Sequence, residues 1–346
     1  MTFDDLLFNS FETVLIASFQ YALVDNDIQN TQDSSKKQYK RTWRDKWLEQ
    51  YNKSLKENSD NDAYNEVITI SQELDRSIEE FKQDYVDAIY ARKARLIILE
   101  LISFTPYYQL SESKQEEQNK WKDLKINTDP WNTKLKNIAT KLGLDSDLPR
   151  YYSECFKAAL NNISGNKQKM IAGVLGGGLA VAVTGGLAAT AIAPIFAASG
   201  LSGAAAISSG LATLGGGAIA AGGFGMAGGF AVIVGGGALI GGAGGLGIAS
   251  LIKNPNFVLY ESAKMEVFAK EIAIREQKDF GKVQDIIKSL NKRIEELQEE
   301  LDDLKSNSNY KNQNSEESFT QEQINKVITY LIRVRDRIRS FKNQWT

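Results

Sequence analysis

The chain lacks histidine entirely and holds a single cysteine, Cys155, among its 346 residues. Without histidine, the sequence excludes Ser-His-Asp and Cys-His nucleophiles, a histidine general base, and zinc or haem held by imidazole. One cysteine excludes an internal disulfide and a metal site built from several thiolates. Cys155 lies in an amphipathic stretch, so we interpret it as a small buried side chain rather than a nucleophile. We therefore expect no enzymatic activity, no cofactor and no metal.

Charge of either sign is missing from one long stretch. The 41 Lys and Arg residues nearly balance 43 Asp and Glu residues, and the net charge of −2 favours no nucleic-acid partner. All of these charges lie outside residues 170–252, a stretch of 83 residues that holds 25 of the 28 glycines. Two G-x-G-x-x-G matches there lack the acidic residue about 20 positions on that a dinucleotide site requires. The charge-free stretch therefore predicts a membrane segment rather than a nucleotide site.

The length of this stretch allows two to four membrane spans, because one spanning helix needs about 20 apolar residues. Pro194 marks a break or turn within it. Lys167 and Lys169 precede the stretch and Lys253 follows it, which favours both ends remaining on the cytoplasmic side. An even number of spans follows from that placement, so we predict one or two helical hairpins.

Several glycines of this stretch recur at intervals of four residues: Gly173 and Gly177; Gly225 and Gly229; Gly237, Gly241 and Gly245. On a helix this spacing makes a smooth groove that lets a second helix approach closely. In water each such glycine costs about 1 kcal/mol relative to alanine. In lipid the backbone groups must bond internally, which favours the helix. These glycines and Pro194 therefore predict a membrane-insertion region that changes its environment.

Two heptad seams follow the glycine-rich stretch. The first consists of Val283, Ile287, Leu290, Ile294, Leu297, Leu301 and Leu304. The second consists of Ile324, Val327, Leu331, Val334, Ile338, Phe341 and Trp345. Alternating steps of three and four residues indicate helices that pack lengthwise. We predict an antiparallel helical hairpin whose loop is 305–318 and whose first helix runs about 50 residues from Pro255, with Gly281 as a place to bend.

The residues before the glycine-rich stretch are also predicted to be helical. One apolar seam consists of Val67, Ile70, Leu74, Ile78, Phe81, Tyr85 and Ala88, and it continues into residues 95–102. A last helix over 150–163 leads to the charge-free stretch. The expected fold is all-α: an elongated bundle of long coiled-coil-like helices with a Gly/Ala-rich apolar helical hairpin inserted. The three expected regions are an N-terminal helical region (1–166), a membrane-insertion region (167–253) and a C-terminal hairpin (254–346).

Two groups of basic residues each allow two interpretations. Lys36, Lys37, Lys40, Arg41, Arg44 and Lys46 alternate with Tyr39, Trp43 and Trp47. They form either a surface for anionic lipid or nucleic acid, or an aromatic stripe that faces the core with a solvated basic back. The latter is favoured. The second group, Arg333, Arg335, Arg337, Arg339 and Lys342, is covered by acidic residues of the N-terminal helices or faces acidic lipid. We therefore treat Lys167, Lys169, Lys253, Arg333 and Arg337 as candidates to face lipid.

The organisation of long amphipathic helices around one apolar Gly/Ala-rich insertion resembles the α-helical pore-forming toxins. Cytolysin A and the haemolysin BL and non-haemolytic enterotoxin group are the nearest comparison, and the resemblance is one of architecture. The glycine-rich stretch is similar to segments of apolipoprotein L-like and bacterial cell-suicide proteins. These resemblances imply a membrane-inserting, pore-forming toxin or cell-suicide effector. Its partners would be a lipid bilayer and either further copies of itself or other subunits of a multi-component pore.

Two other functions fit the same pattern. One is a resident membrane scaffold or tether with cytoplasmic coiled-coil domains, and the other is a soluble coiled-coil interaction protein. Residues 170–252 contain no Trp or Tyr, although resident spans usually carry both at the membrane interfaces, so conditional insertion is favoured. The acidic start of the chain and Glu12 predict no Sec signal. We expect synthesis in the cytoplasm and membrane association of the active form, with secretion, if any, by a non-Sec route.

Overall fold

The computed structural model describes residues 8–56, 63–104, 106–107, 116, 120–121, 123–165, 239, 251–252, 255–308 and 315–346. All regular secondary structure among these residues is helical, which confirms the all-α prediction. The N-terminal helices are α1 (Ser10–Gln29), α2 (Ser34–Lys56), α3 (Ala63–Gln72), α4 (Leu74–Gln83), α5 (Asp87–Ser103), α7 (Thr128–Lys141) and α8 (Leu148–Ser164). After the glycine-rich segment (residues 167–253) come α14 (Pro255–Val267), the π-helix η4 (Phe268–Glu276), α15 (Phe280–Ser308) and α16 (Ser315–Trp345).

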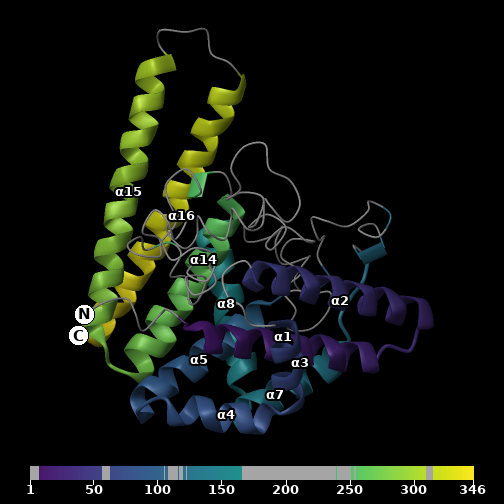
Figure 1. The fold of residues 1–346 in the computed structure, drawn as a ribbon. Helices are drawn as coiled ribbons and strands as arrows, with labels where there is room; N and C mark the ends of the chain where they lie inside the picture. The colour runs from purple at the N-terminus through teal and green to yellow at the C-terminus, as the bar shows by residue number, and fades with distance from the viewer. Residues whose placement is uncertain are drawn as a thin grey trace.

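Helix α1 is the centre of the N-terminal group, where α2, α3, α5 and α7 contact it (Figure 1). A capping box fixes its start: the Glu12 amide donates to Asn9 Oδ1 at 2.9 Å, and the Asn9 amide donates to Glu12 Oε2 at 2.7 Å. Leu15, Phe19 and Leu23 are completely buried on its inner side. The apolar residues of α1 thus anchor the N-terminal half of the core.

The apolar seam expected over 67–102 is split into three helices instead of one. Breaks at Glu73 and at Asp84–Val86 separate α3, α4 and α5. No glycine or proline lies at either break, so the local sequence gives no signal for them. Packing explains the outcome: α3 lies on α1, whereas α5 runs through the core with residues 96–102 buried. A straight helix could not make both sets of contacts, and tertiary packing overrides local propensity.

The single 50-residue helix expected from Pro255 is also divided. Helix α14 widens into η4, and the chain then turns at Lys278, whose φ is 55°. The amides of Lys278 and Asp279 donate back to the carbonyls of Ile274 and Ala273 at 3.2 and 2.8 Å. Asp279 then caps α15 by accepting from the Lys282 amide at 2.9 Å. The bend therefore falls at Lys278, before Gly281.

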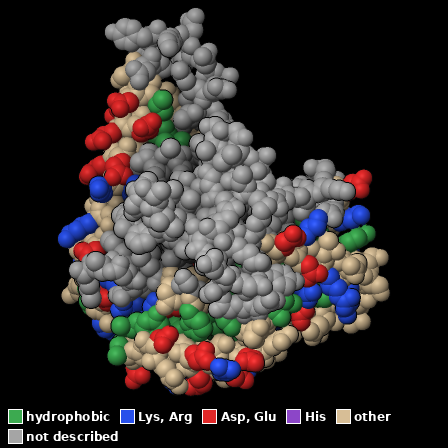
Figure 2. All heavy atoms as spheres, in the orientation of Figure 1, with side chains coloured by type: hydrophobic (Ala, Val, Ile, Leu, Met, Phe, Trp, Pro, Cys, Tyr) green, Lys and Arg blue, Asp and Glu red, His purple; other side chains and the backbone are tan. Residues whose placement is uncertain are grey.

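Helices α15 and α16 form an antiparallel pair that extends past the other described helices (Figure 1). Both predicted seams are buried from Val283 to Leu301 and from Ile324 to Ile338, whereas Trp345 at the end of the second seam is 43% exposed. The connection is shorter than expected, because α15 continues to Ser308 and α16 begins at Ser315. Acidic side chains line the outer edge of α15 in Figure 2, and those of Glu295, Glu299, Glu300, Asp302 and Asp303 are exposed. These acidic residues therefore form a solvated face of α15.

Helix α14 is enclosed by its neighbours. It packs against α8 and α16 (Figure 1). Its Tyr260 hydroxyl and Lys264 ammonium group donate to the Ser103 carbonyl and the Glu100 carboxylate of α5. Every residue from Val258 to Val267 is buried except Tyr260, which is half-buried. Between Val258 and Val267, the charged side chains of this helix are therefore buried together with the apolar ones. The first helix after the glycine-rich segment is thus held in the core partly by ion pairs.

Candidate functional site at the two ends of the glycine-rich segment

The helices that border the glycine-rich segment lie against each other in opposite directions. Phe156 of α8 meets Tyr260 of α14 with ring centroids 5.0 Å apart. Nearer the start of α8, the Tyr151 hydroxyl donates to Glu271 of η4 at 2.6 Å. Along α8 the chain runs from Tyr151 to Phe156, whereas their partners run in the reverse order, from Glu271 back to Tyr260. The two helices are therefore antiparallel, and the end of α8 lies beside the start of α14. The two described helices that border the glycine-rich segment therefore bring its two ends to the same end of one helix pair.

Arg333 of α16 closes the end of α8. Its guanidinium donates to the Ile163 carbonyl at 2.7 Å, which satisfies one acceptor of the last helical turn. A cation at this position also interacts favourably with the helix dipole. Gly165 follows with φ of 75°, and a Cβ added there would lie 2.6 Å from Arg333 Nη1. A glycine at this position thus allows both the left-handed turn and the close approach of Arg333.

Arg337, one turn further along α16, binds the helix on the other side of the segment. Its Nε and Nη2 each donate to a carboxylate oxygen of Glu266 at 2.7 Å. Glu266 is only 4% exposed and also accepts from Lys270 at 2.6 Å. The hydrogen bonds to Glu266 raise the pKa of Arg337 above its ordinary value, so the guanidinium stays charged. Consecutive turns of α16 therefore hold α8 and α14.

A charge cluster of Glu100, Glu261 and Lys264 joins α14 to α5. Lys264 Nζ lies 2.7 Å from Glu100 Oε2 and 3.1 Å from Glu261 Oε1, and all three side chains are at most 10% exposed. Burial lowers the pKa of Lys264, but the two carboxylates outweigh it, and the pKa lies well above the ordinary value. Burial, together with the charge of Glu100, raises the pKa of Glu261 to about 7. Glu261 is therefore the member of the cluster that carries a proton near neutral pH.

The same helices carry the single cysteine at their other end. Cys155 is half-buried on α8 near Tyr151 and Glu271, and burial followed by the charge of Glu271 raises the pKa of its thiol to about 11. The thiol is therefore protonated at neutral pH, and thiols react as nucleophiles in the thiolate form. This environment fits the interpretation of Cys155 as a packed side chain. Among the described residues, no group of three or more potential ligands could hold a metal ion.

The sequence-predicted candidates fall partly inside and partly outside the described residues. Arg333 and Arg337 are described, and both bind protein groups. The acid that pairs with Arg337 is Glu266 of α14, whereas one of the two interpretations named acids of the N-terminal helices. A role for either residue in facing lipid stays a prediction. The remaining candidates lie outside the described residues: Gly173, Gly177, Gly225, Gly229, Gly237, Gly241, Gly245, Pro194, Lys167, Lys169 and Lys253.

The aromatic stripe of α2 faces the core, as the favoured interpretation predicts. Trp43 is fully buried, Trp47 is 6% exposed, and the two rings stack with centroids 6.0 Å apart. Arg41 is exposed on the opposite side, and Lys36 is exposed in the first turn of the helix. The outer side of α2 also has an open hollow of about 410 Å³, lined by Thr42, Asp45, Lys46 and Glu49. Both signs of charge line it, so the hollow has no net attraction for a polyanion.

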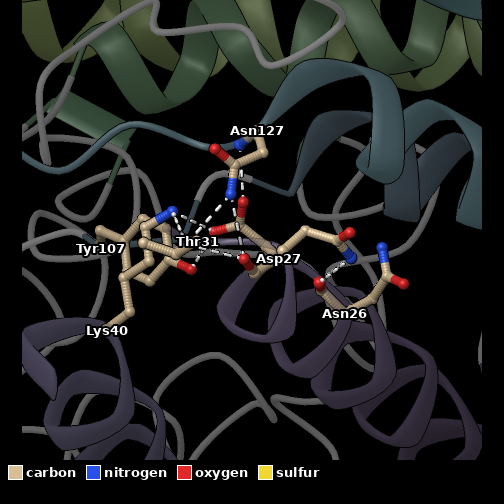
Figure 3. A network of polar contacts seen from close by, with 7 residues as sticks. Asn26, Asp27, Thr31, Lys40, Tyr107 and Asn127 are labelled. Carbon is tan, nitrogen blue, oxygen red and sulfur yellow. Dashed lines mark hydrogen bonds and ion pairs between the residues drawn. The ribbon is translucent and has the colours of Figure 1, made fainter. Parts of the chain in front are cut away.

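Lys40 differs from the rest of the basic group because it is buried in a polar network that the sequence did not reveal (Figure 3). Its Nζ donates to Asp27 at 2.6 Å and to Thr31 at 3.1 Å. Asp27 also accepts from the Tyr107 hydroxyl and, at 2.6 Å, from the Asn127 amide. Burial is the main reason that the pKa of Lys40 is lowered and that of Tyr107 is raised. With Asp27 completely buried and its oxygens occupied, the network serves to join α1, α2 and the chain before α7.

Among the described residues, no helix combines the length and the apolar character needed to cross a membrane. No protein-family model matches the chain, and the searches of curated proteins and of solved structures also gave no match.

Proposed function

We propose that the chain is a membrane-inserting, pore-forming protein that uses its glycine-rich segment to enter a lipid bilayer and to assemble there with further copies or partner subunits. The segment enters as one or two helical hairpins, and its glycines at four-residue intervals form the grooves through which helices pack. The observation that carries the proposal is the stretch of 83 residues without any charged side chain. Every charged residue of the chain lies before or after this stretch. The long C-terminal hairpin belongs, in this proposal, to an elongated coiled-coil-like bundle.

The positions of the bordering helices support this proposal. The end of α8 and the start of α14 lie at the same end of an antiparallel pair. A segment that leaves and returns at one place can cross a bilayer an even number of times without separating these helices. Arg333 and Arg337 bind α8 and α14 from consecutive turns of α16, so loss of the α16 contacts would free both ends together. In this mechanism the contacts of α16 with α8 and α14 hold the two ends of the segment until α16 moves.

Leakage of a fluorescent dye from liposomes tests the proposal, with anionic and neutral lipid compositions compared. A Gly241→Ile/Gly245→Ile variant fills the predicted groove, and we expect its leakage rate to fall, because the bulky side chains prevent the close approach of a second helix. The matched control is Ala243→Ile/Gly247→Ile, shifted by two positions, or about 200° around the helix. Equal leakage by the two variants argues against glycine grooves, and no leakage from any liposome overturns the proposed function.

The alternative of a resident membrane protein is distinguished by fractionation. The segment lacks the Trp and Tyr residues that resident spans usually place at membrane interfaces, which favours conditional insertion. We therefore expect part of the protein in the soluble fraction without detergent and a shift of this part to the membrane fraction after liposomes are added. Protein found only in membranes supports the resident scaffold. Protein that stays soluble and leaves liposomes intact supports a soluble interaction protein.

A further inference from the structure

The charge cluster at the α5–α14 contact is unbalanced. It brings together two carboxylates, from Glu100 and Glu261, and one ammonium group, from Lys264. Glu261 is 1% exposed, and its Oε2 has no hydrogen-bond partner in its surroundings. A buried charge needs a partner to offset its loss of hydration, and one lysine cannot neutralise two carboxylates. A proton on Glu261 makes the cluster neutral, and loss of that proton leaves a net negative charge in the core.

Among the described residues, the groups that act on the charge of Glu261 are Lys264 and Tyr260 of its own helix and Glu100 of α5. Lys264 is the only cation of these three groups. From α16, Arg337 binds Glu266, and from α8, Tyr151 binds Glu271. Lys270 also pairs with Glu266. Arg337 of α16 and Lys270 of η4 are therefore both already paired with Glu266.

We infer that the charge cluster is a proton-dependent latch: protonated Glu261 holds α14 against α5, and loss of this proton loosens α14 and with it the end of the glycine-rich segment. The latch contacts α14 between Tyr260 and Lys264, where the Tyr260 hydroxyl also donates to the Ser103 carbonyl of α5. Both contacts hold the helix that immediately follows the segment. The latch itself is a property of the helical body, whereas its consequence for insertion rests on the proposed function.

The direction of the pH effect follows from the two states of Glu261. Folding raises its pKa from the ordinary value of 4.5 to about 7. Between these values the closed state binds more protons than the open state, so closure weakens as the pH rises. One proton released per opening gives up to about a tenfold change in the opening equilibrium per pH unit. Below about pH 4.5 and above about pH 7 this contribution becomes constant. The latch is therefore closed in acid and loosens toward neutral and alkaline pH.

Hydrogen exchange of the full-length protein without lipid tests the latch. Protection factors, corrected for the intrinsic effect of pH on exchange, are measured by mass spectrometry between pH 5 and pH 8. For peptides of α14 we expect protection to fall by up to about tenfold per unit between pH 5 and pH 7 and then to level off. Helix α7 serves as an internal reference, because it carries no residue of the cluster and has its most extensive contacts with α1, and its protection should change much less than that of α14.

Two variants identify the group responsible. Glu261→Gln cannot lose a proton, so α14 protection should stay flat across the range and as high as in the wild type at pH 5. Glu100→Gln removes a nearby negative charge, so Glu261 ionises at lower pH and the total fall becomes smaller. The second variant keeps the test informative if the first does not fold. A wild-type profile for α14 that parallels α7, or an unchanged fall in Glu261→Gln, overturns the latch.

Dye leakage at pH 6 and pH 8 separates the latch from the proposed function. We expect wild-type leakage to be faster at pH 8 and the difference to disappear in Glu261→Gln. If α14 protection falls with pH but liposomes never leak, the latch stands and the pore-forming function is wrong. If liposomes leak while α14 protection is independent of pH, the pore-forming function stands and the latch is wrong.

Discussion

Arg337 of α16 donates two hydrogen bonds of 2.7 Å to Glu266 of α14, one to each carboxylate oxygen. Two parallel bonds between a guanidinium and a carboxylate fix the relative orientation of the groups as well as their distance. Glu266 is nearly buried, while Arg337 is one-third exposed. The pair therefore ties the first helix after the glycine-rich segment to the last helix of the chain.

Replacement of Arg337 should lower the free energy of unfolding more than replacement of an arginine that has no buried partner. We expect Arg337→Gln to lower the free energy of unfolding by about 2 kcal/mol, because Glu266 keeps only Lys270 as a partner for a buried charge. Arg339→Gln is the matched control, since Arg339 is 46% exposed and makes a long ion pair of 4.0 Å with the exposed Asp336. Urea denaturation followed by circular dichroism measures both. Equal losses in the two variants contradict an anchoring role for Arg337.

A methyl group at Gly165 should disturb both the backbone and Arg333. Gly143 is the matched control, because its φ is also positive, at 71°, but a Cβ there meets no atom within 4 Å. We expect Gly143→Ala to cost about 1 kcal/mol of stability for the left-handed backbone alone. Gly165→Ala should cost about 1 kcal/mol more, since the new methyl group displaces the guanidinium from the Ile163 carbonyl.

The Gly165 prediction is checked by repeating the substitution without Arg333. In an Arg333→Ala background, the cost of Gly165→Ala measured by urea denaturation should fall to that of Gly143→Ala. If the cost of Gly165→Ala is the same with and without Arg333, the two residues do not interact and the excess belongs to the backbone.

The seams show what the sequence could predict. Heptad spacing places apolar side chains on one side of a helix, so the burial of Val283 to Leu301 and of Ile324 to Ile338 followed from local periodicity. The same reasoning failed at Lys278, where the chain turns without glycine or proline. A turn there depends on the contacts that η4 and α15 make with other helices. Periodicity therefore predicted which residues face the core but not where the helices break.

Buried ion pairs were beyond sequence reasoning for a different reason. Lys40 and Asp27 lie 13 positions apart and Lys264 and Glu100 lie 164 apart, in segments where charged residues are common. A charge on a helix is usually solvated, and the favoured interpretation of α2 therefore placed Lys40 on a solvated basic side. A weak signal was present in α14, where three charged residues, Glu261, Lys264 and Glu266, lie within six positions of a helix that follows a hydrophobic segment.

The Asp27–Lys40 pair should be essential to the N-terminal helices. We expect Asp27→Asn to lower the free energy of unfolding by about 3 kcal/mol, because it leaves the buried ammonium group of Lys40 without its counter-charge. Adding Lys40→Met removes that charge and should restore part of the loss. Glu80→Gln provides a control in an exposed pair with Arg76 and should change stability by less than about 0.5 kcal/mol. A double variant that is less stable than Asp27→Asn contradicts this explanation.

Alkylation of Cys155 should be slow and should require alkaline pH. Burial and the charge of Glu271 raise the pKa of this thiol to about 11, whereas its ordinary value is 9.0. Only the thiolate reacts, so the rate with iodoacetamide should keep rising above pH 9, where the rate for a cysteine in a short peptide approaches its maximum.

Glu271→Gln removes a negative charge that disfavours the thiolate, so the rate curve of this variant should shift to lower pH. The exposed Glu154→Gln should shift it less, because Glu154 has the smallest of the effects on this thiol. Mass spectrometry of the alkylated protein gives both curves, and a wild-type curve that levels off near pH 9 contradicts the buried environment of Cys155.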